Sequence, residues 1–344
     1  MTYYRRLSII ILCAVFSSSV SAQEEQDTLK IYTQEVRLPV VAYDDYERFD
    51  PTLAPDDILV LEDGVPQRVR SVRRVPANIP LVFDLGGQVT GTRHSHTTRE
   101  AALRLIKSLR AGDRLAIIQN SNRVELLQDW TSDLDVATQT LTMKFFSSNR
   151  SRLSECLTTA ASTLKDQPVG NTHIVVFTDG LEAQTRNEIR AGAIQKDALR
   201  NLIATQASVH LFGYAALIED FVKSRNSLVS FGGSGTVAKV VIDTDVEMRR
   251  WFKNYARATK QREEQLTALA QETGGRILLP SSTEGIIKQV EQVSRDIEAQ
   301  YVVTYAPKRL FEPTSGAVRP INVFSRRIGL RLFSLRSHVV APAT

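Results

Sequence analysis

The stretch 79-IPLVFD-84 and its later counterpart 173-HIVVFTD-179 decide the fold of this chain. Each is a continuous run of Val, Ile, Leu and Phe, which is typical of a strand buried on both faces of a parallel sheet. Each run ends in an aspartate, Asp84 or Asp179. Because ligands of open α/β sheets bind at the carboxyl ends of the strands, we expect the two carboxylates to meet at one site.

Around these two runs, helical and strand patterns alternate along the chain. Apolar residues recur at helical spacing in 97–109, 133–143, 153–164, 262–273 and 284–299, which predicts helices there, and a more polar helix is predicted to end at Thr205. Short apolar runs predict further strands at 114–119, 209–213 and 277–279. Val124–Leu127 follows a turn and predicts an antiparallel edge strand. The stretch 215–254 shows no clear period, and its 231-FGGSG-235 predicts a surface loop because the Gly-Lys-Ser/Thr of a phosphate loop is absent. The alternation predicts an α/β domain over 78–298, with a mostly parallel, Rossmann-like sheet and helices on both faces.

Both ends of the chain are instead rich in strands without helices. The segment 28–75 alternates apolar and polar residues, and its Asp63-Gly64 lies between two apolar runs, which is a strong hairpin signal. Strand patterns return from Tyr301 onward. Since 28–75 is too short to make a sandwich by itself, we expect 23–77 and 299–344 to pair into one small β-sandwich-like domain that carries the α/β domain as an insertion.

Residues 1–22 predict a secretory signal peptide. Arg5 and Arg6 precede an apolar stretch, and a small-residue tail ends at Ala22. The apolar stretch falls well short of the ~20 residues of a membrane-spanning helix, and no other stretch is long and apolar enough to cross a bilayer. The sequence therefore predicts an exported protein, periplasmic or extracellular. Its one remaining cysteine, Cys156, lies on an apolar helix face and is expected to be an inert core thiol.

The charge of the chain argues against a nucleic-acid surface. The formal net charge is +5, and it falls to +3 when the two arginines of residues 1–22 are removed. The basic residues are scattered, and few aromatic residues lie among them, whereas nucleic-acid-binding surfaces gather their charge on one face. We therefore expect no nucleic-acid partner and assign the cations to solvated edges and loops.

Several motifs together resemble those of exported bacterial proteins that carry a von Willebrand factor A (VWFA) domain between strand-rich flanks. The motifs, spread over roughly residues 30–310, are 56-DDILVLEDGVPQ-67, 111-AGDR-114, 127-LQDWTSD-133, 177-FTDG-180, 272-ETGGR-276 and 300-QYVVTY-305. The resemblance implies a non-enzymatic, adhesion- or scaffold-type protein that recognises a protein partner at the carboxyl ends of the strands. It also implies a divalent cation there, held by an Asp-x-Ser-x-Ser motif, a threonine of a later loop and a final aspartate.

This sequence departs from that metal-site pattern. Asp84 and Asp179 fit its first and last positions, but Gly86 and Gln88 stand at the two serine positions, and Ser151 is the best candidate for the threonine. Mg²⁺ demands near-ideal octahedral oxygen geometry, so a site of Asp84, Gln88, Ser151 and Asp179 is expected to hold Mg²⁺ or Mn²⁺ weakly. We favour no resident cofactor.

Three other interpretations of these residues stay open. Asp84 and Asp179 can be structural, each capping the helix or turn that follows it. Arg150 and Arg152 oppose cation binding by Coulomb repulsion and can instead take an acidic partner directly. In the alternative function, a metal-dependent hydrolase, Asp84 and Asp179 would hold a metal-bound water, although no general base accompanies them. His94 and His96 lack a third ligand for zinc and are expected to be surface-loop histidines.

Overall fold

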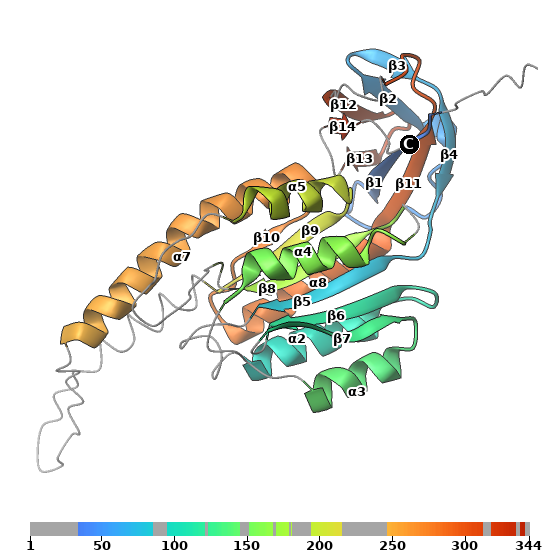
Figure 1. Cartoon of the computed structure of the whole chain (residues 1–344). Coiled ribbons are helices and arrows are strands. Elements are labelled where there is room, and N and C mark those ends of the chain that lie inside the picture. Colours follow the sequence, from blue (N-terminus) through green and yellow to red (C-terminus); the bar gives the residue numbers. More distant parts are fainter. Residues whose placement is uncertain are drawn as a thin grey trace, which may run out of the picture. The chain divides into compact units, whose positions relative to one another are not determined.

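The structure is a computed structural model that describes residues 34–84, 95–120, 123–144, 151–167, 170–178, 180, 194–214, 246–311, 318–334 and 338–340. Its centre is a six-stranded sheet with the order β10-β9-β8-β5-β6-β7 (Figure 1). These strands are β5 (Asn78–Asp84), β6 (Arg114–Asn120), β7 (Val124–Thr131), β8 (His173–Thr178), β9 (Ser208–Gly213) and β10 (Ile277–Leu278). All neighbours are parallel except β6 and β7, so the prediction of a mostly parallel sheet with an antiparallel edge strand is confirmed.

Helices cover both faces of the central sheet. They are α2 (Ser95–Ser108), α3 (Leu134–Lys144), α4 (Leu153–Thr163), α5 (Lys196–Ala204), α7 (Val246–Thr273) and α8 (Thr283–Ala299). On β8, Val175 and Phe177 pack in one core cluster with α2, α3 and α8, whereas Ile174 and Val176 pack in a second cluster with α4 and α5. Successive strand residues point to opposite faces, so a strand between two helical layers must be apolar at every position.

Helix α7 differs from its prediction. The sequence predicts a helix over 262–273, but α7 begins at Val246 and contains 28 residues. In its first half, 246-VEMRRWFKNYARAT-259, basic residues are interspersed among the apolar ones, which obscures the apolar stripe for a sequence-based prediction. Tyr255 and Ala258 join the first core cluster and Leu266 joins the second, so tertiary packing supports the full length of the helix.

Strands from the two ends of the chain form two antiparallel sheets, with the orders β13-β1-β11-β4 and β14-β12-β2-β3. They comprise β1 (Val36–Asp44), β2 (Ile58–Glu62), β3 (Val65–Gln67), β4 (Val69–Arg73), β11 (Gln300–Tyr305), β12 (Val318–Ser325), β13 (Leu330–Ser334) and β14 (His338–Val340). Residues of both sheets share one core, including Leu38 and Val303 of the first and Val60 and Ile321 of the second. The predicted hairpin turn is present, with positive φ at Asp63 and Gly64.

The first of these sheets is also buried on the face that points away from that core. Val41 and Val302 lie on this outer face and are buried, as is Gln300. Helix α8 runs into β11 without a linker, and Tyr43 of β1 donates a hydrogen bond to Asp296 of α8 over 3.3 Å. The sheets and the α/β part therefore pack against each other, and residues from 34 onward form one compact unit.

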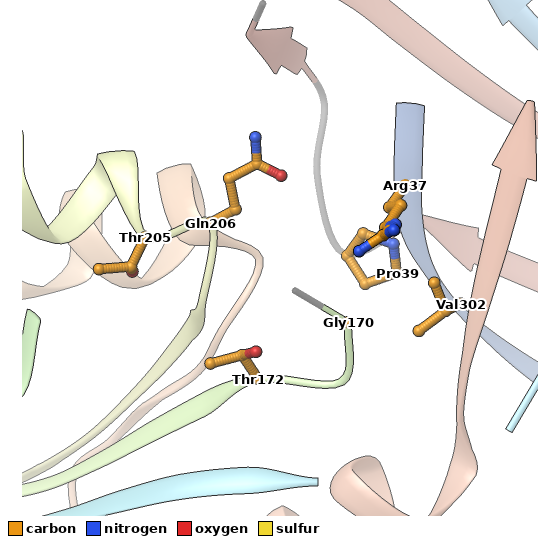
Figure 2. A pocket seen from close by; sticks show the side chains of 7 residues that line it. All are labelled: Arg37, Pro39, Gly170, Thr172, Thr205, Gln206 and Val302. Carbon is orange, nitrogen blue, oxygen red and sulfur yellow. The ribbon is translucent and has the colours of Figure 1, made fainter. Parts of the chain in front are cut away.

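A small pocket lies at this junction. Figure 2 shows its lining, which includes Arg37 and Pro39 of β1, Val302 of β11, and Thr172 and Gln206 of the α/β part. Its volume is about 10 Å³, the space of roughly one water molecule. The pocket is thus a packing defect and not a site for a substrate. Among the described helices, none is both long and apolar enough to cross a membrane.

Candidate functional site

Three strands of the central sheet end side by side in polar residues. Asp84 is the last residue of β5 and pairs in register with Thr178, the last residue of β8. On the other side of β5, Phe83 pairs with Gln119, so Asn120 at the end of β6 stands next to Asp84. Parallel strands bring these ends to one edge of the sheet, which we call the crest.

The carboxylate of Asp84 accepts four hydrogen bonds from described residues, two on each oxygen. Oδ1 accepts from Asn120 Nδ2 at 2.8 Å and from the backbone N–H of Arg152 at 2.9 Å. Oδ2 accepts from Ser151 Oγ at 2.5 Å and from Thr178 Oγ1 at 3.0 Å. A carboxylate offers about four lone-pair positions, so these donors fill its accepting capacity. Asp84 therefore joins the ends of β6 and β8 to the start of α4.

Asp84 has no contact with solvent, and burial raises the pKa of its carboxyl above the ordinary value. The hydrogen bonds from Ser151, Arg152, Asn120 and Thr178 act in the opposite direction because they stabilise the charged form. The arrangement has the form of a buried structural anion whose charge is balanced by donors. Asp84 also ties down backbone before α4, through the N–H of Arg152, whereas the turn that follows it, where capping was predicted, lies outside the described residues.

The described half of the crest does not fit a directly bound metal ion. Hard cations such as Mg²⁺ bind through oxygen lone pairs, and those of Asp84 already face four donors. Thr178 Oγ1 donates to Asp84 and accepts from the N–H of Gly180 at 2.9 Å. Among the described residues, no group of three or more His, Cys, Asp or Glu is placed to hold a metal.

Arg262 of α7 adds a buried cation next to the crest. Its side chain is 1% exposed, and its Cγ lies 2.7 Å from the position that a Cβ on Gly180 would occupy. Gly180 has a φ of +77° and directly follows Asp179, so the glycine allows the arginine stem to lie against this turn. Arg262 Nη1 also donates to Gln265 Oε1 at 2.6 Å.

Arg152 lies beside Asp84 at the solvent-exposed side of the crest. It is the N-cap residue of α4, its side chain is 38% exposed, and it forms an ion pair with Glu155 at 3.0 Å. Part of its charge is thus balanced within the chain, and solvent reaches the rest. Ser151, directly before it, is buried with its hydroxyl on Asp84.

The structure brings together only some of the predicted site residues. Asp84 and Ser151 meet, and Arg152 lies beside them, whereas Gln88, Arg150 and Asp179 lie outside the described residues. His94 is also outside them, and His96 is an exposed residue in the first turn of α2 and not in a loop.

Sequence reasoning missed three residues of the crest, Asn120, Thr178 and Arg262. The first two carried a usable signal, since each ends the strand next to β5 with a hydrogen-bond donor. Arg262 carried none, because only the tertiary packing of α7 brings it to Gly180.

The mostly parallel sheet with helices on both faces and a polar crest places this protein in the general class of open α/β folds, which bind ligands at the carboxyl ends of their strands. Within that class, residues 81–182 match the family model of the von Willebrand factor type A domain. The chain thus contains a von Willebrand factor type A domain, as the sequence motifs predicted. No curated protein matches the chain.

Solved structures similar to this chain include three with the following values. A von Willebrand factor type A protein from Catenulispora acidiphila has 9% identity over 90% of this chain and 73% of that chain, with a TM-score of 0.46. Proximal thread matrix protein 1 from the mussel byssus has 13% identity over 64% of this chain and 48% of that chain, with a TM-score of 0.43. The PilB minor pilin from Streptococcus sanguinis has 10% identity over 66% of this chain and 63% of that chain, with a TM-score of 0.43. The chain spans about half of the mussel protein, and these likenesses concern the fold alone.

Proposed function

We propose that this protein is an exported, non-enzymatic binding protein of the adhesion or scaffold type, which recognises an acidic protein partner at the crest without a resident metal. The observation that carries the proposal is the saturation of Asp84 by four donors. A carboxylate in that state orders the crest but does not offer a lone pair to a cation. The altered motif at Gly86 and Gln88 points the same way.

The partner-facing groups of this proposal are Arg150 and Arg152, with Gln88, Ser151 and Asp179 around them. In a metal-dependent site, the cation itself attracts an acidic residue of the partner. Here arginine side chains would supply that attraction, and a guanidinium binds a carboxylate through two parallel hydrogen bonds. The backbone N–H of Arg152 is held by Asp84, so its side chain would project from a rigid base.

The direct test is capture of the partner from the exported fraction of the source cells on immobilised mature protein. Wild-type protein is compared with Arg150→Glu/Arg152→Glu, and both are run in EDTA and in Mg²⁺. We expect a partner that is retained in EDTA and lost with the charge-reversed variant. Lys308→Glu/Arg326→Glu, which changes two exposed cations of the sandwich, is the matched control and should retain it. A partner that needs Mg²⁺ and ignores the reversal would refute the proposal.

The hydrolase alternative is tested on the same samples. Two strand-end carboxylates would need a metal-bound water to hydrolyse a phosphate or ester. Because Asp84 is occupied by donors, we expect no turnover of such substrates above a heat-treated control, with or without Mg²⁺ or Mn²⁺. Metal-dependent turnover that Asp179→Ala abolishes would favour the enzyme instead.

A further inference from the structure

A chain of hydrogen bonds runs from the central sheet to the link that joins it to the antiparallel sheets. His210 Nε2 of β9 lies 3.1 Å from His173 Nδ1 of β8, and His173 Nε2 lies 2.6 Å from Asn171 Oδ1. Asn171 Nδ2 in turn donates to the backbone oxygen of Val75 over 3.2 Å. Since Val75 lies between β4 and β5, the chain ends on the covalent connection between the two parts of the molecule.

The carbonyl of Val75 sets the positions of the protons along this chain. A carbonyl only accepts, so Asn171 turns its NH₂ group to Val75 and its oxygen to His173. His173 therefore carries its proton on Nε2 and accepts from His210 at Nδ1. Both rings are neutral in this arrangement. The remaining ring nitrogen, His210 Nδ1, is buried and has no hydrogen-bond partner among the described residues.

A further proton does not fit this arrangement. On His173 it would face the N–H of His210, and on His210 it would take the buried Nδ1. The charged groups that act on His210 are Asp296 of α8 and Arg276 next to β10, and the group that acts on His173 is His210. Asp296 favours a charge on His210, but it is already bound by Arg276 and by Tyr43 of β1. Protonation therefore breaks the chain or competes for the carboxylate that holds β1.

Both consequences act on the contact between the antiparallel sheets and the α/β part. Val75 leads from β4 into β5, and Tyr43 connects β1 to α8. The contact is already incomplete beside the chain, because Thr172, next to Asn171, lines the small pocket of Figure 2. A charged imidazole is costly to bury and gains hydration when such a contact opens.

We propose that the His173–His210 pair is an acid-sensitive joint. A bound proton releases the contacts at Val75 and Tyr43, and the antiparallel sheets come loose from the α/β part while each part stays folded. This inference goes beyond the proposed function, because it involves none of the crest residues. It gives an exported protein a means of responding to the pH of its surroundings.

The direction and the pH range follow from the burial of the rings. Burial lowers the pKa of His210 from 6.5 to about 4 in the closed joint, whereas an exposed imidazole keeps its ordinary value. The open joint thus binds a proton more tightly, so the closed form is favoured above about pH 6.5 and is lost as pH falls toward 4. His210 alone should raise the ratio of open to closed molecules about tenfold between about pH 6.5 and 5.

Energy transfer between two dyes, measured on single molecules of the mature protein, tests the joint. The dyes are attached in Asn322→Cys/Thr158→Cys, which places one on exposed β12 and one on exposed α4, while the buried Cys156 stays unlabelled. We expect one narrow distance distribution at pH 7 and a second, broader one that grows at least tenfold between about pH 6.5 and 5. The far-UV circular dichroism should stay unchanged over that range.

Two variants, each made in the dye-labelled protein, assign the effect to the histidine pair. His210→Gln keeps an N–H donor for His173 but cannot take up the proton, so its rise should be about tenfold smaller than in wild type. Asn171→Ala cuts the chain at Val75 and should populate the second distribution already at pH 7. His96→Gln, an exposed change on α2, is the control and should match wild type. An equal rise in His210→Gln and wild type, no second distribution by pH 4, or loss of circular dichroism in step with the dye signal would overturn the proposal.

Discussion

At the scale of single residues, Asp84 is the centre of the crest. It is a charge with no solvent contact, held by two hydroxyls, a side-chain amide and a backbone N–H from three separate segments. Removing one partner of a buried hydrogen bond costs more than the bond itself contributes, because the other partner stays desolvated. We therefore expect substitutions of Asp84 to lower the stability of the fold, even though the metal-site motif around it is degraded.

Asp84→Asn tests this role with little change in shape. The amide would turn an NH₂ group toward two of the four donors, and each unsatisfied buried donor costs about 1–3 kcal/mol. Relief of the buried charge offsets part of this loss, so we expect the free energy of unfolding in urea to fall by about 2–4 kcal/mol. Asp197→Asn on the surface of α5 is the control and should stay within about 0.5 kcal/mol. A change at Asp84 no larger than the control would show that the four donors do not depend on its charge.

The site was only partly predictable at this scale. Asp84 and Ser151 followed from a strand-end carboxylate and a hydroxyl-bearing loop, and the structure joins them. What the sequence could not supply was the saturation of the carboxylate. That depends on the register that sets Thr178 and Asn120 beside Asp84, and on the backbone N–H of Arg152, which no side-chain pattern reports.

At the scale of elements, the strands and most helices were predictable because their apolar periods are strong. β5 and β8 are buried at every position, and their continuous apolar runs gave both their type and their place in the sheet. The start of α7 was missed because its first half mixes basic residues among the apolar ones. The buried residues that hold it are spaced among cations, so the helical period is weak in hydrophobicity.

Two neighbouring strands, β8 and β9, share a buried pair of histidines. His173 Nδ1 lies 3.1 Å from His210 Nε2, and His173 Nε2 lies 2.6 Å from Asn171 Oδ1. Since the amide oxygen only accepts, His173 Nε2 carries the proton, and Nδ1 accepts from His210. Burial lowers the pKa of both rings, with His210 at about 4, where Arg276 lowers it further and Asp296 opposes the shift. A proton added to His173 would go to Nδ1 and face the donor of His210, and a proton added to His210 would go to Nδ1, which is buried without a hydrogen-bond partner among the described residues.

This pair makes stability depend on pH in a defined direction. The folded state binds fewer protons than the unfolded state between about pH 4 and pH 6.5, so the contribution is present above pH 6.5 and is lost as pH falls toward 4. Asp84, with a raised pKa, contributes in the opposite direction, so the variant must be compared with wild type. In His210→Gln, the loss of unfolding free energy between about pH 6.5 and 5 should be smaller by about 1.5 kcal/mol. The same loss in His210→Gln and wild type would contradict this assignment, and His96→Gln is the control.

At the scale of the whole molecule, the strands of both sandwich sheets and the α/β part belong to one compact unit that begins at Gln34. Strand β1 pairs with β11 and β2 pairs with β12, and the insertion with the domain limits 23–77, 78–298 and 299–344 remains a prediction. The sequence did not reveal the junction. Val41 and Val302 face away from the sandwich core and are buried there, which needs the α/β part to be in place.

A small network ties this junction together. Arg276, which precedes β10, binds Asp296 of α8 through two hydrogen bonds, and Tyr43 of β1 donates to the same carboxylate. Burial, together with the charge of Asp296, raises the pKa of Tyr43 to about 12, so the phenol stays a donor at physiological pH. The network therefore joins a strand of the sandwich to the helix that leads into β11.

Asp296→Ala should weaken both parts together. The change removes hydrogen bonds to a charged group, each worth about 1.5–3 kcal/mol, but Arg276 is partly exposed and can turn to solvent, so we expect a loss of about 2 kcal/mol. Hydrogen exchange measured by mass spectrometry should show protection falling in β1 and β11 as well as in β8 and β9. Glu298→Ala, an exposed change on the same helix, is the control. Loss of protection confined to the α/β strands would refute a single cooperative unit.

The most direct test of the central claim, a crest that works without a metal, is thermal unfolding of the mature protein in EDTA and then in increasing Mg²⁺ or Mn²⁺. A ligand that binds only the folded state must raise the unfolding temperature once its concentration exceeds the dissociation constant. We expect no saturable rise up to millimolar metal, in wild type and Asp179→Ala alike. A saturable rise in wild type that is absent in Asp179→Ala would contradict the account and restore a metal ion to the crest.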